Sequence, residues 1–165
     1  MIEAAIIDEG WGKDADWEAL GQTAVAWAVS RTPYGGLARS DTPVEVAIRL
    51  TTDAEVHLLN RQYRDKDKPT NVLSFPMYAP DEILDLEDER LPEIMLGDIV
   101  LARETCQREA DDKGIPMPTH ATHLIVHGVL HLLGYDHIDD EDANKMEALE
   151  RLIMADLGHD DPYGD

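Results

Sequence analysis

The chain has 165 residues, 43% of them hydrophobic and 30% charged, which is typical of one globular domain that buries its own core. It has no apolar run of about eighteen residues, so we expect no transmembrane helix, and its N-terminus lacks the basic region and apolar core of a signal peptide. Its one cysteine, Cys106, allows no internal disulfide and fits a cytoplasmic location. The formal net charge of −21 would repel the phosphates of nucleic acid if it were spread evenly over the surface.

The hydrophobic pattern of residues 1–64 predicts two strands and two helices. Between residues 17 and 28 the apolar side chains recur at three- and four-residue spacings, as in a helix with one buried face. Between residues 44 and 50 large apolar side chains alternate with smaller or charged ones, which is typical of a half-buried strand. In chain order we expect a strand over residues 2–8, a helix from Asp14 or Asp16 to about Ser30, a strand over 44–50, and a helix from Thr52 or Asp53 to near Arg64.

The remainder of the chain predicts two more strands and three helices. The expected elements are a strand over residues 72–75 that Pro76 ends, a strand over 94–101, a helix from Ala102 to Gly114, a helix that Thr119 begins, and a helix from Asp139 or Asp140 to Gly158. Gly97, inside the second of these strands, indicates a bulge or a close backbone approach. Residues 76–92 are rich in Asp, Glu and Pro and are expected to form a mobile acidic loop. We therefore predict an α+β fold with a single domain over residues 1–165, a four-stranded mixed sheet and about five helices.

Three of the seven histidines lie close together in the segment 127–137. His127 and His131 are four residues apart, so on a helix they lie on one face, one turn from each other. Gly134 favours the left-handed conformation that ends a helix, so the chain can reverse and bring His137 back toward the pair. Three imidazole nitrogens can hold one zinc ion and leave its fourth position open, as catalytic rather than structural sites do. Because this helix is apolar on nearly all sides, we expect the metal site on a central, buried helix.

The pattern His-x3-His-x2-Gly-x2-His also occurs in the metzincin zinc proteases. In those enzymes the residue after the first histidine is a glutamate that acts as the general base. The corresponding residue here is Gly128, which has no side chain to accept a proton. The sequence therefore keeps the ligand pattern of a zinc hydrolase and argues against peptide hydrolysis.

Positive charge is concentrated just before the strand predicted at residues 72–75. Four of the 14 basic residues occupy eight positions, namely Arg61, Arg64, Lys66 and Lys68. Because the charge is segregated in this way, the negative net charge does not exclude an anionic ligand at one face. Arg64 alone also fits a surface arginine at the end of a helix, where the helix dipole favours a cation.

Three segments resemble the signatures of the YbeY family of metal-dependent endoribonucleases, bacterial factors linked to ribosomal RNA maturation. They are the histidine segment 127–137, the segment from Asn60 to Pro76, and Leu96-Gly97-Asp98-Ile99, and they occur in the order and separation of the family. The similarity extends from about Val44 to Tyr163, whereas the first forty residues match only in general layout.

This resemblance implies that His127, His131 and His137 bind one metal ion per chain, with zinc expected before nickel or another metal that favours imidazole. It also implies that Arg64 is the basic catalytic residue of the cleft. An arginine stays charged and can bind two oxygens of a phosphodiester, whose negative charge grows in the transition state.

Further residues are expected to support these four. The expected substrate contacts are Arg61, Lys66, Lys68, Thr70 and Ser74. His123 either supports the metal site or packs in the core, and Asp136 is placed to orient an imidazole N–H. Asp98 either does the same or simply ends a strand.

Three functions follow as alternatives. The first is a zinc-dependent endoribonuclease that cuts single-stranded RNA and, by the resemblance alone, processes ribosomal RNA beside ribosomal or ribosome-associated proteins, away from membranes. The second is a zinc hydrolase of another class, such as a protease, which would need a base other than Gly128. The third is a non-nucleolytic ribosome assembly factor with a structural metal, since an acidic surface also suits a protein partner. Attack on the phosphate by the RNA 2′-hydroxyl and attack by zinc-bound water both remain open.

Overall fold

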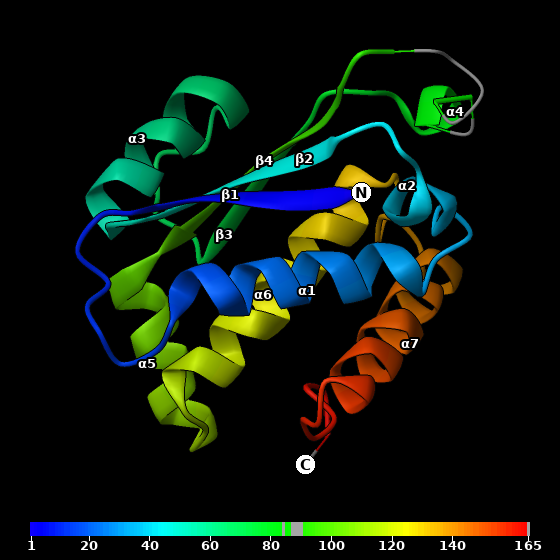
Figure 1. Cartoon of the computed structure of the whole chain (residues 1–165). Helices are drawn as coiled ribbons and strands as arrows, with labels where there is room; N and C mark the ends of the chain where they lie inside the picture. Colours follow the sequence, from blue (N-terminus) through cyan, green and yellow to red (C-terminus); the bar gives the residue numbers. More distant parts are fainter. Residues whose placement is uncertain (84, 87–90, 165) are drawn as a thin grey trace.

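Four strands form one mixed sheet in the order β1-β2-β4-β3 (Figure 1). They are β1 (Ile2–Asp8), β2 (Val44–Thr51), β3 (Val72–Pro76) and β4 (Ile94–Ala102). β1, β2 and β4 run parallel, and β3 pairs with β4 in the antiparallel direction at one edge. This computed structural model describes residues 1–83, 85–86 and 91–164.

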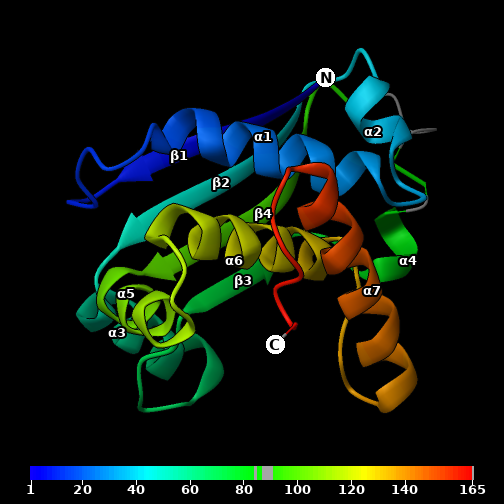
Figure 2. The same cartoon turned by 90° about the horizontal axis from the view of Figure 1, so that it is seen from below.

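The described residues form seven helices around this sheet. They are α1 (Trp17–Ser30), α2 (Gly36–Arg39), α3 (Asp53–Arg64), α4 (Pro80–Ile83), α5 (Arg103–Lys113), α6 (Met117–Leu132) and α7 (Asp140–Asp156). α1 and α6 cover one face of the sheet, and α3 lies on the opposite face (Figures 1 and 2). The predicted α+β fold with a four-stranded mixed sheet is confirmed. None of these helices combines the length and the apolar character that crossing a membrane requires.

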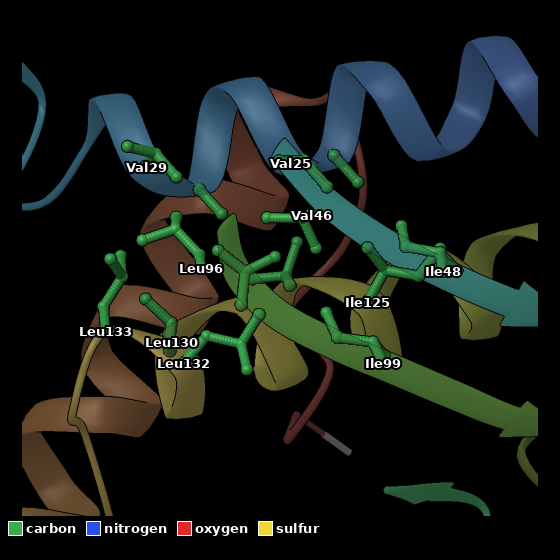
Figure 3. Close-up of a cluster of buried hydrophobic side chains, with 14 of the residues drawn as sticks. Val25, Val29, Val46, Ile48, Leu96, Ile99, Ile125, Leu130, Leu132 and Leu133 are labelled. Carbon is green, nitrogen blue, oxygen red and sulfur yellow. The ribbon is translucent and has the colours of Figure 1, made fainter. Parts of the chain in front are cut away.

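The main core lies between the sheet and the helices α1 and α6 (Figure 3). It joins Val25 and Val29 of α1, Val46 of β2, Ile99 of β4 and Ile125 of α6. Eleven of the 16 residues of α6 are buried, which confirms the central helix expected from its apolar sequence. α6 is therefore a rigid support for the side chains that it carries.

Three predicted helix starts are confirmed by side-chain caps. Asp16, Thr52 and Asp139 each accept a hydrogen bond from a backbone N–H in the first turn of α1, α3 and α7. Such bonds satisfy donors that have no partner inside the helix. The strands and long helices expected from the sequence are all present, with ends that differ by one or two residues.

The predicted start of α6 at Thr119 is wrong. The helix begins two residues earlier, at Met117, directly after Pro116. Pro118 fits in the first turn because the N–H that it lacks would have no partner inside the helix. The sequence pattern also missed α2 and α4, since four residues are too few to show a helical period.

The segment 76–92, expected as a mobile acidic loop, contains ordered structure in its described part. α4 lies within it, and the side chains of Ile83 and Leu86 are buried in the main core. Residues 84 and 87–90 lie outside the described residues, so the mobility of the whole segment stays a prediction.

Gly97 allows β3 and β4 to approach each other closely beside α6. The register of β2 against β4 shifts at this point, because Glu45 pairs with Met95 while Val46 pairs with Gly97. Gly97 has a φ of +148°, and a Cβ atom there would lie 2.3 Å from the carbonyl oxygen of Phe75. The bulge and close approach predicted at this glycine are both present.

We expect Gly97→Ala to lower the free energy of unfolding by about 3 kcal/mol or more, because the new methyl group meets backbone as well as an unfavourable φ. The matched control is Gly10→Ala, which also has a positive φ but has no atom within 4 Å of the added Cβ. There the backbone conformation alone should cost about 1 kcal/mol. Urea denaturation measures both values, and equal losses would contradict the close approach.

Candidate functional site

α6 and the turn after it bring the three predicted histidines together. His127 and His131 lie one turn apart, with their Nε2 atoms 3.0 Å from each other. One nitrogen of His137 lies within 4.8 Å of a nitrogen of each of the other two rings. Within residues 1–83, 85–86 and 91–164, no other group of three His, Cys, Asp or Glu residues converges in this way.

Gly134 makes the turn that returns His137 to the helix. Its φ is +95°, in the left-handed region that favours glycine. The N–H of Tyr135 bonds to the carbonyl of Leu130 at 3.0 Å, which ends the helix. A Cβ atom at Gly134 would lie 2.8 Å from the Cβ of Pro80, so α4 packs against the same turn. The chain reversal predicted here is present.

The Nδ1 atoms of His127 and His131 both donate hydrogen bonds to protein oxygens. His127 Nδ1 lies 2.7 Å from a carboxylate oxygen of Glu150, and His131 Nδ1 lies 3.0 Å from the carbonyl oxygen of Tyr135. Because carboxylates and carbonyls only accept, each Nδ1 carries the hydrogen and each Nε2 of the neutral ring is a bare acceptor. Two bare acceptors thus face each other at 3.0 Å and cannot bond without a shared cation.

The low pKa of His131 also favours metal binding by this ring. Burial, with the neighbouring rings of His127 and His137, lowers the pKa of His131 to about 4. The ring is therefore neutral near pH 7, which is the form that binds metals. Tetrahedral zinc with bonds of about 2.0–2.1 Å holds its nitrogen ligands about 3.3 Å apart, so the spacing of the two Nε2 atoms fits such an ion.

Glu150 is a residue of this site that the sequence pattern did not reveal. It lies on α7, and its side chain is fully buried. The carboxylate accepts hydrogen bonds from His123 at 3.0 Å, from His127 at 2.7 Å and from the hydroxyl of Tyr163 at 2.7 Å. Burial would raise the pKa of Glu150, but the hydrogen bonds from His123 and His127 hold it well below its ordinary value. His123, expected either to support the metal site or to pack in the core, is buried and shares Glu150 with His127.

A cleft of about 600 Å³ runs from these histidines to the basic segment after α3. Arg64, the expected catalytic residue, lines it together with four of the five expected substrate contacts, namely Lys66, Lys68, Thr70 and Ser74. His127, His131 and His137 line the same cleft, so segments far apart in the sequence meet at one site. The cationic rim therefore gives an acidic protein a local place for an anion.

Asn60 holds the basic segment in place and was not identified from the sequence. Its side chain is only 2% exposed, and its amide donates a 2.8 Å hydrogen bond to the carbonyl of Lys68. At the end of α3, Asp65 adopts a φ of 55°, and the N–H of Lys66 bonds to the carbonyl of Asn60. Its place inside the family-like segment was the signal that could have singled it out.

Arg61, Asp98 and Asp136 were also predicted to support the site, and the structure places them at three different positions. Arg61 is exposed on α3 and does not line the cleft. Asp98 lies beside Tyr63 and Phe75 on the sheet face that α3 covers, away from the histidines. Asp136 accepts a hydrogen bond from the backbone N–H of His137 at 2.8 Å, while its carboxylate is 3.7 Å from His137 Nδ1. Asp136 is therefore the one of these three that lies beside a histidine of the cleft.

A cleft that joins converging imidazoles to a cationic rim is the kind of site that metal-dependent hydrolases use on phosphate esters. The family model described as Endoribonuclease YbeY matches residues 15–158. The chain belongs to this family of nucleases, as its three sequence segments indicated.

Individual relatives agree with this assignment. The chain is 57% identical to an Endoribonuclease YbeY of Rhizorhabdus wittichii over 164 residues, which are 99% of this chain and 97% of that protein. It is 57% identical to another of that name from Sphingopyxis alaskensis over 155 residues, which are 94% and 92% of the two chains. The chain also shares its fold with the solution structure of TM1509 from Thermotoga maritima. The alignment of the two covers 100% of each chain, with a TM-score of 0.53 and 23% identity.

We expect Asn60→Ala to loosen the basic segment, because it removes the hydrogen bond that holds Lys68. The loss of one such bond should lower the free energy of unfolding by about 1 kcal/mol and speed trypsin cleavage after Arg64 and Lys66. Asn144→Ala, at an exposed position of α7, is the control. Equal trypsin rates in both variants would show that Asn60 does not hold the segment.

Proposed function

We propose that this protein is an endoribonuclease that cuts single-stranded RNA with the help of one zinc ion per chain, held by His127, His131 and His137. The observation that carries the proposal is the pair of bare Nε2 atoms of His127 and His131, 3.0 Å apart. Both histidines line a cleft that has a cationic rim. The family assignment adds the reaction, because the relatives are named endoribonucleases.

The donor set fits zinc. Three imidazoles supply the nitrogen ligands that zinc prefers, and three protein ligands leave a position open for chemistry. When bound, the ion supplies Lewis acidity that offsets negative charge developing on a phosphoryl oxygen. Glu150 and the carbonyl of Tyr135 hold two of the rings with their Nε2 atoms toward the cleft.

Arg64 supplies the second positive charge at the scissile phosphate. It is exposed at the end of α3 and lines the same cleft as the histidines. Its guanidinium can bind two phosphate oxygens and holds its charge at any working pH. Lys66 and Lys68 then bind flanking phosphates, while Thr70 and Ser74 offer hydroxyl hydrogen bonds along the same wall.

Ribosomal RNA is the proposed substrate, with ribosomal or ribosome-associated proteins as partners and the cytoplasm as the location. These parts rest on the family resemblance. Single-stranded RNA suits a cleft with a cationic rim, since its backbone can follow a short row of basic residues.

Peptide hydrolysis receives no support from the site. Gly128, at the position of the metzincin base, faces the sheet, and a Cβ atom there would lie 3.0 Å from the side chain of Ile99. The backbone of Gly128 lines the cleft, but a side chain built there would start against Ile99, which would have to shift by a few tenths of an ångström. The packing therefore agrees with the argument from sequence.

Metal binding is tested first with His131→Ala. The wild-type protein should bind one zinc ion per chain, and the variant should lose it, because one of the paired Nε2 atoms is gone. His57→Ala is the control, since His57 lies on α3, half-buried, and pairs with Asp67 outside the three-histidine group. Zinc retained by His131→Ala after dialysis would contradict the proposed ligand set.

RNA cleavage is tested with a matched pair of arginine variants. Arg64→Ala should slow the cleavage of a labelled single-stranded RNA by about 10²–10³-fold, the scale for the loss of one donor to a transition-state charge. Arg61→Ala removes the same charge from the same helix outside the cleft and should change the rate little.

The outcomes of that assay separate the alternatives. Equal cleavage by wild type and His131→Ala would identify a contaminating nuclease. If wild type holds zinc and cuts no RNA, the assembly-factor alternative replaces the nuclease. Degradation of casein that a chelator abolishes would revive a protease.

A further inference from the structure

Glu150 is a buried carboxylate whose described partners carry no permanent positive charge. Its side chain is 0% exposed, and the side chains that reach it are two imidazoles and a phenol. A buried carboxylate is unfavourable unless hydrogen bonds and a nearby cation compensate it. The far side of the His127 ring, where Nε2 faces His131, is the place in this arrangement where a cation would lie.

The hydrogen bond from His127 to Glu150 also sets the tautomer and the orientation of the His127 ring. With Nδ1 donating at 2.7 Å, the ring keeps one tautomer and one orientation, and Nε2 stays a bare acceptor. His131 is held differently, by the backbone carbonyl of Tyr135. One helical ligand therefore depends on a main-chain atom and the other on a side chain from α7.

The C-terminal segment 157–164 holds Glu150 from the other side. Tyr163 donates its hydroxyl hydrogen to the second carboxylate oxygen at 2.7 Å, and its ring packs edge-on against His123 with centroids 5.3 Å apart. Arg151 of α7 lies over the Tyr163 ring at 5.4 Å and also pairs with Asp161. The segment runs back beside α7 (Figure 2), and through Tyr163 it contacts Glu150 and His123.

We propose that Glu150 is a positioning residue for the metal ligand His127, and that Tyr163 keeps Glu150 in place for this role. The path runs from Tyr163 through Glu150 to His127, so the C-terminal segment acts on the metal site without touching it. The proposal rests on the proposed function only in taking the three histidines as the zinc ligands. Such partners of a ligating histidine raise its basicity and set its orientation.

The test measures zinc affinity by competition with a chromophoric chelator, with zinc as the only ligand. Glu150→Gln keeps the shape of the side chain and removes its charge, and should weaken zinc binding by about 10–100-fold. Tyr163→Phe removes one hydrogen bond to Glu150 and should weaken it less. Glu141→Gln is the control, because Glu141 lies on the same helix, exposed, and pairs with Lys145.

Two further readouts separate positioning from a merely structural role. The visible spectrum of cobalt in place of zinc should change in Glu150→Gln, because it reports the geometry around the ion. Thermal unfolding of the metal-free proteins shows whether each variant folds. If Glu150→Gln does not fold, the zinc affinity and cobalt spectrum of Tyr163→Phe test the positioning role.

An unchanged zinc affinity and cobalt spectrum in the folded variants would overturn the proposal. A wild-type protein that binds zinc and cuts no RNA would overturn the nuclease function and leave this comparison valid. A wild-type protein that binds no zinc would overturn both.

Discussion

The close packing of α6 on the sheet is the constraint on which the rest of the site depends. Gly128 lies between His127 and His131 in the sequence and lets α6 approach Ile99, where a Cβ atom would be only 3.0 Å from that side chain. With that face of the helix against β4, His127 and His131 lie at the cleft beside β3. The glycine that removes a protease base thus also sets the depth at which the histidines lie.

Electrostatics in this protein is a matter of distribution rather than total charge. A chain with a net charge of −21 places Arg64, Lys66 and Lys68 along one cleft, where Asn60 holds their backbone. Burial keeps His131 neutral, while hydrogen bonds keep Glu150 ionised close by. The same site therefore presents bare nitrogens to a cation and fixed cations to an anion, as phosphoester hydrolysis with a metal requires.

Local patterns predicted most of the fold and the convergence of His127, His131 and His137, because both depend on neighbours in the sequence. The four-residue spacing of His127 and His131 and the reversal at Gly134 are of this kind. Glu150 could not be found in this way, since an acidic residue on an amphipathic helix looks like solvated surface until α7 is packed on α6. Arg61 was expected to contact substrate but does not line the cleft, because a run of basic residues does not show which of them the fold brings to it. The start of α6 was misplaced because Thr119 is a better cap by type than Pro116.

The most direct test of the account is X-ray absorption at the zinc edge on the wild-type protein loaded with one equivalent of zinc. The account predicts three imidazole nitrogens at about 2.0–2.1 Å from the ion and no sulfur ligand. The contradicting result is a spectrum with fewer than three imidazoles, or with sulfur from Cys106, because either would place the ion away from His127, His131 and His137.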